Sequence, residues 1–164
     1  MAKNKTPVAV VLPEDGIPPA LYNHVVDNAE LVTIQLRRHE FDVDGEFYNP
    51  DAGKKLSFDK ACLGCTYDQE TSMVAGTFRF SIGAKSGRKV VLKSVADYLV
   101  AYEFAVDVNE EAAKGFCSRV GLFAAYPYYR ALVASLSASA NLNLPTLPMI
   151  ATRGVRLPEL SADA

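Results

Sequence analysis

The sequence predicts an α+β fold, because four strand-like segments are followed by one long apolar helix. Apolar and polar residues alternate over much of the segment from about residue 30 to residue 106, and turn-forming residues interrupt the alternation at intervals. From about residue 109 to residue 140 the pattern changes to that of a helix that is apolar on nearly every side. The length of 164 residues suits one domain with its own core, so we expect a single domain over residues 1–164.

The first 30 residues are predicted to be an N-terminal extension that contains one short helix. Gly16-Ile-Pro-Pro precedes this helix, and proline is favoured in a first helical turn. We expect the helix to end near Asn28. Its predicted apolar face consists of Leu21, Val25 and Val26.

The first predicted strand is followed by a long polar loop. Residues 44–55 contain the turn-forming pairs Asp-Gly, Asn-Pro and Ala-Gly. This loop carries two adjacent aromatic residues, Phe47 and Tyr48, which we expect to be exposed and to mark a binding site. The alternating apolar residues of the strand before it are Val32, Ile34 and Leu36.

Three further strands are predicted in the middle of the chain. They are expected at residues 56–67, 72–82 and 89–106, with a hairpin turn over residues 83–88. The fourth strand is apolar on both faces, so both of its faces need to be covered. The predicted inward face of the third strand consists of Val74, Phe78, Phe80 and Ile82.

The helix expected from Asn109 to Ala140 carries very little charge. We expect a break near Gly121, and from there to the end of the helix Arg130 is the only charged residue. A soluble helix that is apolar nearly all round must be buried nearly all round, and the sheet of one chain can cover only one side of it. The sequence therefore predicts an oligomer. Small residues that would let a second helix approach are Ala131, Ala134, Ser135 and Ala138.

The C-terminal residues are not expected to be helical. Residues 142–150 are apolar, but Pro145 and Pro148 interrupt them, which predicts an extended segment. Residues 151–164 are predicted to be a loose tail.

No residue pattern indicates an enzyme or a bound metal ion. Cys62 and Cys65 form a CxxC motif in a predicted strand, where residues three apart face opposite ways, and Cys117 lies far downstream. His24 and His39 have no recognised metal-ligand spacing with these cysteines. The sequence contains no GxGxxG, Walker or GxSxG motif. We therefore expect reduced thiols, no metal, no cofactor and no catalytic residue.

The charge and the apolar segments limit the classes of partner. The formal net charge of −2 is too small to indicate binding to nucleic acid. The apolar stretch from Val120 to Ala140 contains Arg130, Pro127 and three serines, so we expect no membrane insertion. The apolar segment from Val8 to Leu12 is too short for a signal peptide, which predicts a cytoplasmic protein.

The segment from Gly121 to Ile150, GLFAAYPYYRALVASLSASANLNLPTLPMI, resembles the signature region of the SecB family of export chaperones. In that family a helix carries an aromatic-Pro-Tyr-x-Arg core and is followed by a Leu/Pro-rich segment. The order of four strands, with a long loop after the first, is also similar, and the resemblance covers about residues 30–150. The residues of this chain that match the signature and assembly helix are Phe123, Tyr126, Pro127, Tyr128 and Arg130.

The resemblance implies a four-stranded antiparallel sheet backed by the long helix, in subunits that form a homotetramer. It also implies ATP-independent holding of unfolded preproteins, which are passed to the SecA motor. The client grooves of the family run along the sheet, the loop after the first strand and the C-terminal segment. The implied client-binding residues are Phe41, Phe47, Tyr48, Phe58, Leu142, Leu144 and Leu147.

Two departures from the family leave the client open. Better-known members are strongly acidic, with an acidic surface that docks SecA, and end in a second helix, whereas this chain is almost neutral and has a proline-interrupted C-terminal segment. The Tyr-Pro-Tyr form and the missing helix are closer to SecB-like proteins linked to toxin–antitoxin systems, which hold one antitoxin. A binding module for a small apolar ligand is the alternative from a different class.

Overall fold

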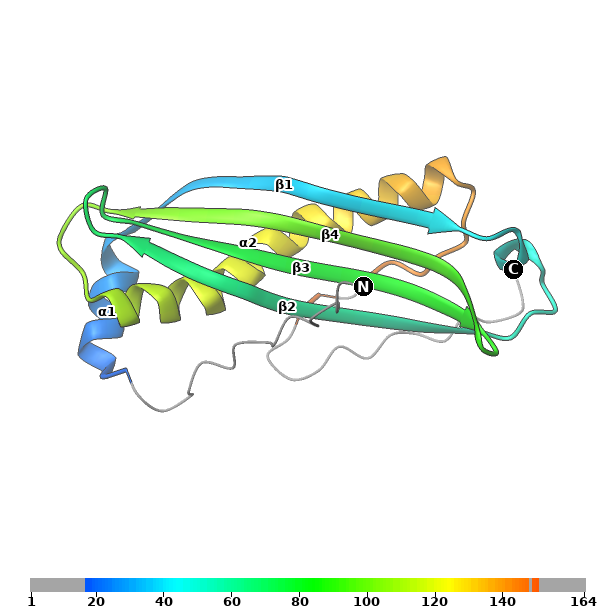
Figure 1. The fold of residues 1–164 in the computed structure, drawn as a ribbon, viewed down its shortest axis with the longest axis horizontal. Helices are drawn as coiled ribbons and strands as arrows, with labels where there is room; N and C mark the ends of the chain where they lie inside the picture. The colour runs from blue at the N-terminus through cyan, green and yellow to red at the C-terminus, as the bar shows by residue number, and fades with distance from the viewer. Residues whose placement is uncertain (1–16, 148, 151–164) are drawn as a thin grey trace, which may run out of the picture. The chain divides into compact units, whose positions relative to one another are not determined.

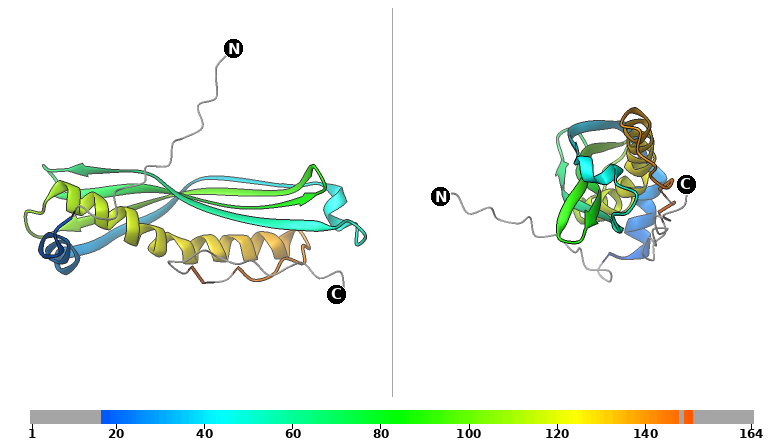
Figure 2. Two further views of the ribbon diagram at one scale, coloured as in Figure 1. Left: turned by 90° about the horizontal axis from the view of Figure 1, so that it is seen from below. Right: turned by 90° about the vertical axis from the view of Figure 1, so that its right-hand side faces the viewer.

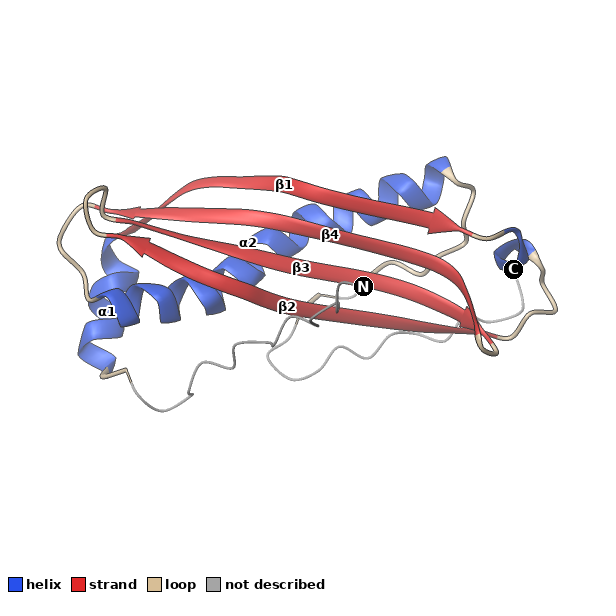
Figure 3. Cartoon of the chain, viewed as in Figure 1, coloured by secondary structure: helices blue, strands red, loops and turns tan. Residues whose placement is uncertain are grey.

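The computed structural model describes residues 17–147, 149 and 150. It contains a four-stranded antiparallel sheet with the strand order β1-β4-β3-β2 and a long helix after the last strand, which confirms the fold class expected from the sequence (Figure 1). Short turns join β2 to β3 and β3 to β4 (Figure 3). The elements in chain order are α1 (Pro19–Asn28), β1 (Ala29–Val43), the 3-10 helix η1 (Gly45–Tyr48), β2 (Lys54–Asp68), β3 (Met73–Ser86), β4 (Lys89–Phe104) and α2 (Glu110–Ser139).

The chain forms two compact units, and each strand and α2 continue from one unit into the other. Unit 1 contains the described residues up to Gln35, together with Ala61–Arg79 and Tyr98–Ala124. Unit 2 contains Leu36–Lys60, Phe80–Asp97 and the described residues from Ala125 onward. Within each unit, α2 lies against one face of the strands (Figure 2). The predicted loose tail, residues 151–164, lies outside the described residues.

In unit 1, α1 packs through fewer residues than the sequence predicts. Pro18 and Pro19 stand at its start, where the fixed φ of proline favours the first turn. Val25 is fully buried, and the Tyr22 ring lies 6.4 Å from that of Phe116 on α2. The predicted apolar face is wrong for its other two members, because Leu21 and Val26 are exposed.

The predicted break in the long helix is wrong, because α2 is continuous from Glu110 to Ser139. Gly121 does not bend the helix but allows α2 to pack closely on β3. A Cβ atom on Gly121 would lie 2.4 Å from Cζ of Phe78 on β3, so the helix can approach the sheet here only without a side chain. The predicted inward face of β3 is confirmed, since its members Val74, Phe78, Phe80 and Ile82 are all buried.

The position of each strand in the sheet decides which faces are covered. The central strand β4 is buried on both faces over much of its length. Its adjacent residues Val91 and Leu92, which point to opposite faces, are each only 1% exposed. The edge strand β1 follows a strand pattern in sequence, yet Val32 and Leu36 are each nearly half exposed. The apolar alternation of β1 therefore predicts the strand correctly but not its burial.

Candidate functional site

In unit 2, the second half of α2 is held on the sheet by stacked aromatic rings. Tyr129 is fully buried and stacks on Phe80 of β3 with a centroid distance of 5.3 Å. Tyr126 contacts Phe80 at 5.8 Å and Phe58 of β2 at 5.7 Å. Burial raises the pKa of the Tyr126 hydroxyl, and the charge of Arg130 opposes this shift. Phe58, expected to contact clients, is thus half-buried and packed on two tyrosines of α2.

The end of α2 is closed by hydrogen bonds that direct the following chain back along the helix. Asn141 has a φ of 52°, the left-handed conformation that commonly ends helices. Its backbone N–H donates to the carbonyl of Ala138, and that of Leu142 donates to the carbonyl of Ser137 at 2.8 Å. The buried Ser137 hydroxyl then donates to the Leu142 carbonyl at 2.9 Å. These bonds fix the start of residues 142–147, which we call the exit segment.

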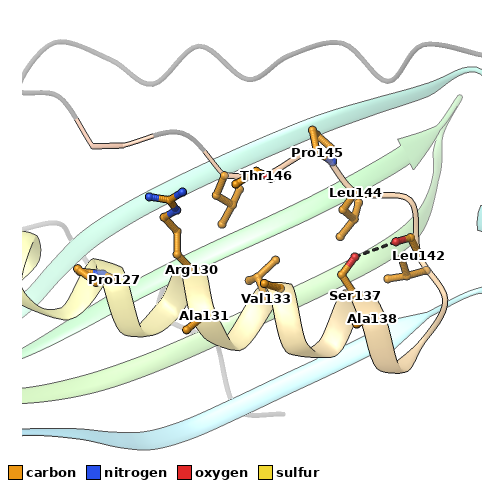
Figure 4. A pocket seen from close by; sticks show the side chains of 12 residues that line it. Pro127, Arg130, Ala131, Val133, Ser137, Ala138, Leu142, Leu144, Pro145 and Thr146 are labelled. Carbon is orange, nitrogen blue, oxygen red and sulfur yellow. Dashed lines mark hydrogen bonds between the residues drawn. The ribbon is translucent and has the colours of Figure 1, made fainter. Parts of the chain in front are cut away.

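A groove of about 540 Å³ lies between α2 and the exit segment (Figure 4). Pro127 lies within α2, and the helix continues through it although proline lacks the N–H for a helical hydrogen bond. Pro127 is exposed and lies at one end of the groove (Figure 4). The lining is almost entirely apolar or small. The residues are Pro127, Arg130, Ala131, Val133, Ala134, Ser137, Ala138, Leu142, Leu144, Pro145, Thr146 and Leu147.

The loop after β1 packs on the side of the exit segment through a small apolar cluster. Phe47 in η1 is only 5% exposed and is part of a cluster with Val91, Leu92 and Leu142. Phe41 and Leu144 are partly buried against the same cluster. The expectation that Phe47 is exposed is therefore wrong: the loop folds over a core of its own, because η1 turns the ring inward.

Tyr48 has the opposite orientation from its neighbour. It is 51% exposed, as the sequence predicts, and its ring lies edge-on to Phe47 at 6.0 Å. Its hydroxyl donates to the carbonyl of Ala140 at 2.7 Å, where α2 ends. The Asp44 carboxylate accepts from the backbone N–H of Glu46 and so caps η1. The loop is thus anchored both to the sheet and to the end of α2.

Arg130 is the one charged side chain among the residues that line the groove. It is half-buried, and Figure 4 shows it extending from α2 beside Thr146. Within the described part of the chain no ion pair involves Arg130.

The three cysteines lie together in unit 1. Gly64 has a φ of 154° and shifts the phase of β2, so that Cys62 and Cys65 face the same way and their sulfur atoms are 3.7 Å apart. The assumption that they face opposite ways is therefore wrong. The hydrogen bond with Cys117 and burial raise the pKa of the Cys65 thiol to about 12. A raised pKa leaves little thiolate, the reactive form.

Other chemistry is not indicated by the described residues. Among residues 17–147, 149 and 150, no three His, Cys, Asp or Glu side chains are placed to hold a metal ion. His24 belongs to unit 1, whereas His39 belongs to unit 2, where it stacks on Phe41 at 6.2 Å. No helix in the described part of the chain is long and apolar enough to cross a membrane.

Five residues expected from the family resemblance line the groove: Pro127, Arg130, Leu142, Leu144 and Leu147. Three of the small residues expected to face a second helix, Ala131, Ala134 and Ala138, line the groove as well. Sequence reasoning did not single out Val133 or Ser137, which also line the groove. They follow Arg130 by three and seven residues, which places them on the same side of α2, and this spacing was the available signal. Tyr128 lies on another side of the helix and is exposed, while Phe123 belongs to unit 1.

Comparison with known proteins gives two informative similarities. Over 55 residues the chain is 42% identical to the SecB-like chaperone SmegB of Mycolicibacterium smegmatis, and this match spans 34% of the chain and 38% of the relative. The structure is similar to that of a Mycobacterium tuberculosis SecB-like chaperone solved in complex with a ChAD peptide from the HigA1 antitoxin. The TM-score is 0.67 at 18% sequence identity, and the match covers 82% of this chain and 99% of the other. No family model matches the chain.

Proposed function

Because the chain is a SecB-like protein, we propose that it is an ATP-independent holdase chaperone that binds extended, non-native polypeptide segments. The observation that supports this function is the groove between α2 and the exit segment, whose lining is apolar or small except for one arginine. An extended segment can place alternate side chains into such a groove while its other residues face away. Three of the residues that the family resemblance implies for client binding, Leu142, Leu144 and Leu147, form one wall.

The chemistry of the groove suits holding rather than conversion of a client. Burial of one client leucine or phenylalanine side chain contributes about 1.5–3 kcal/mol, so one groove alone would bind weakly and reversibly. Several grooves in one assembly would raise the affinity for a long unfolded chain, because the second contact becomes intramolecular. The proposal needs no nucleotide and no catalytic residue.

We further propose assembly into a homotetramer through the side of α2 that faces away from the groove. Tyr128, Ser135 and Ser139 are exposed and follow one another at spacings of seven and four residues, so they share one side of the helix. No charge lies on this side between residues 125 and 139. Light scattering of the parent chain should give a tetramer, and Ser135→Arg should reduce the mass. A parent chain that stays monomeric at micromolar concentration would overturn the assembly.

The client can belong to either of two kinds. The first is the general set of unfolded preproteins delivered to SecA for export from the cytoplasm. The second is one dedicated partner such as an antitoxin, and two observations favour it: the structural relative was solved with an antitoxin peptide, and this chain is almost neutral. Binding of the chain to purified SecA, measured by calorimetry, separates the two.

The holdase activity is tested by filling the groove. Ala134 is exposed and lines the groove, so Ala134→Trp should occupy its volume without disturbing the core. Thr66→Trp, at an exposed position of β2 in unit 1, is the matched control. The parent chain and the control should suppress aggregation of a reduced, unfolded model protein, whereas Ala134→Trp should do so poorly. Equal protection by both variants, or none by the parent chain, would contradict the proposal.

A small apolar ligand is the competing occupant of the same groove. A volume of about 540 Å³ lies within the usual range of small-molecule sites. Native mass spectrometry of the purified chain distinguishes this case, because a resident ligand would add a fixed mass that Ala134→Trp removes.

A further inference from the structure

The groove contains one cationic side chain in otherwise uncharged surroundings. Eleven of its twelve lining residues are uncharged, and the twelfth is Arg130. This arginine is half-buried, and no ion pair joins it to another described residue. A guanidinium held in a partly apolar groove loses some of its hydration, so a partner anion gains more there than at an open surface.

We propose that Arg130 recognises a carboxylate of the bound client, so that the groove selects extended segments in which an aspartate or glutamate lies close to apolar residues. The proposal rests on the holdase function above and names its class of client segment. The guanidinium presents a planar set of donors that matches both oxygens of a carboxylate, whereas glutamine or lysine in the client offers no such acceptor pair.

The dimensions of α2 set the spacing of the recognised residues. Ser137 lies seven residues after Arg130, on the same side of the helix, at the end of the groove where Leu142 packs. A rise of 1.5 Å per residue places these positions about 10 Å apart. An extended client advances about 3.3 Å per residue, so its acidic residue should stand two to four residues from the apolar residue that lies near Leu142.

Fluorescence anisotropy with labelled peptides tests the proposal on the full chain. Three extended peptides share the same apolar residues and carry glutamate, glutamine or lysine three residues from the main apolar anchor. The parent chain should bind the glutamate peptide about tenfold more tightly than the glutamine peptide, and the lysine peptide most weakly. Raised salt should reduce the preference for glutamate.

Substitutions then assign the preference to one residue. Arg130→Gln should bind the glutamate and glutamine peptides equally, and Arg130→Lys should restore part of the preference. Arg119→Gln is the control, because Arg119 also lies on α2 but belongs to unit 1, where it stacks over Tyr22. Circular dichroism melting establishes that each variant is folded before the peptides are compared.

The outcomes separate this proposal from the holdase function itself. If the parent chain binds both uncharged and acidic peptides equally, or if Arg130→Gln keeps the preference, carboxylate recognition fails while the holdase function stands. If no peptide binds and aggregation is not suppressed, both fail. If the full chain binds none of the three peptides and a chain that ends at residue 150 binds them all, the chain's own C-terminal residues occupy the groove, and recognition of a client carboxylate is overturned.

Discussion

Replacement of Phe47 by alanine tests whether the loop after β1 is a structural anchor. The ring is 5% exposed and packs in the cluster with Val91, Leu92 and Leu142. Loss of a buried phenylalanine side chain typically lowers the free energy of unfolding by about 3–5 kcal/mol. Because η1 lies at the end of the sheet and can partly collapse into the space, we expect a value near the lower limit, about 3 kcal/mol for Phe47→Ala.

Urea unfolding followed by circular dichroism, at one fixed protein concentration, measures this loss. With a denaturant dependence of about 1–3 kcal/mol per molar urea, the midpoint should fall by at least about 1 M. Tyr48→Phe is the control: it removes only the hydrogen bond to the Ala140 carbonyl, at an exposed position, and should lower stability by about 0.5 kcal/mol. A Phe47→Ala midpoint within 0.2 M of the parent, on the order of experimental error, would refute the packing argument and return the ring to the exposed role expected from sequence.

Three further outcomes follow from the packing and the titratable groups. Since the Cys65 pKa is raised from 9.0 to about 12, its neutral thiol stabilises the fold below pH 9, and stability should fall between pH 9 and pH 12; urea midpoints of Cys65→Ser should fall less over this window. Gly121→Ala should lower stability by about 1–3 kcal/mol, because its Cβ would lie 2.4 Å from a β3 phenylalanine ring, while Gly45→Ala, with nothing within 4 Å, should not. Ser137→Ala should lower stability by about 1 kcal/mol and speed hydrogen exchange at Leu142, as mass spectrometry would show.

The elements of the fold could be predicted from sequence because each depends on a local pattern. The alternation along β3 and the uncharged stretch of α2 indicate a strand and a helix whatever lies next to them. Burial depends on neighbours that are distant in the chain. Leu31, Val32 and Leu36 of the edge strand β1 are exposed, and no feature of the strand's own sequence shows its position in the sheet.

The candidate site could be predicted only in part, for the same reason. The apolar exit segment and the unusual Arg130 stand out in the sequence and do line one groove. Phe47 was expected to be exposed because polar residues surround it, but it turns inward on Leu142, which follows α2 far along the chain. The shared orientation of Cys62 and Cys65 depends on one glycine conformation that shifts the strand phase.

Leu142 and Leu144 belong at once to the groove and to the cluster beneath η1, and this double membership makes the two sites thermodynamically linked. Any occupant that favours the docked exit segment must also favour the docked loop, because both need the same leucines in place. By reciprocity, the factor by which loop docking changes affinity for the occupant equals the factor by which the occupant changes loop docking. Backbone amides of η1 would then report on occupancy of the groove without touching what is bound there.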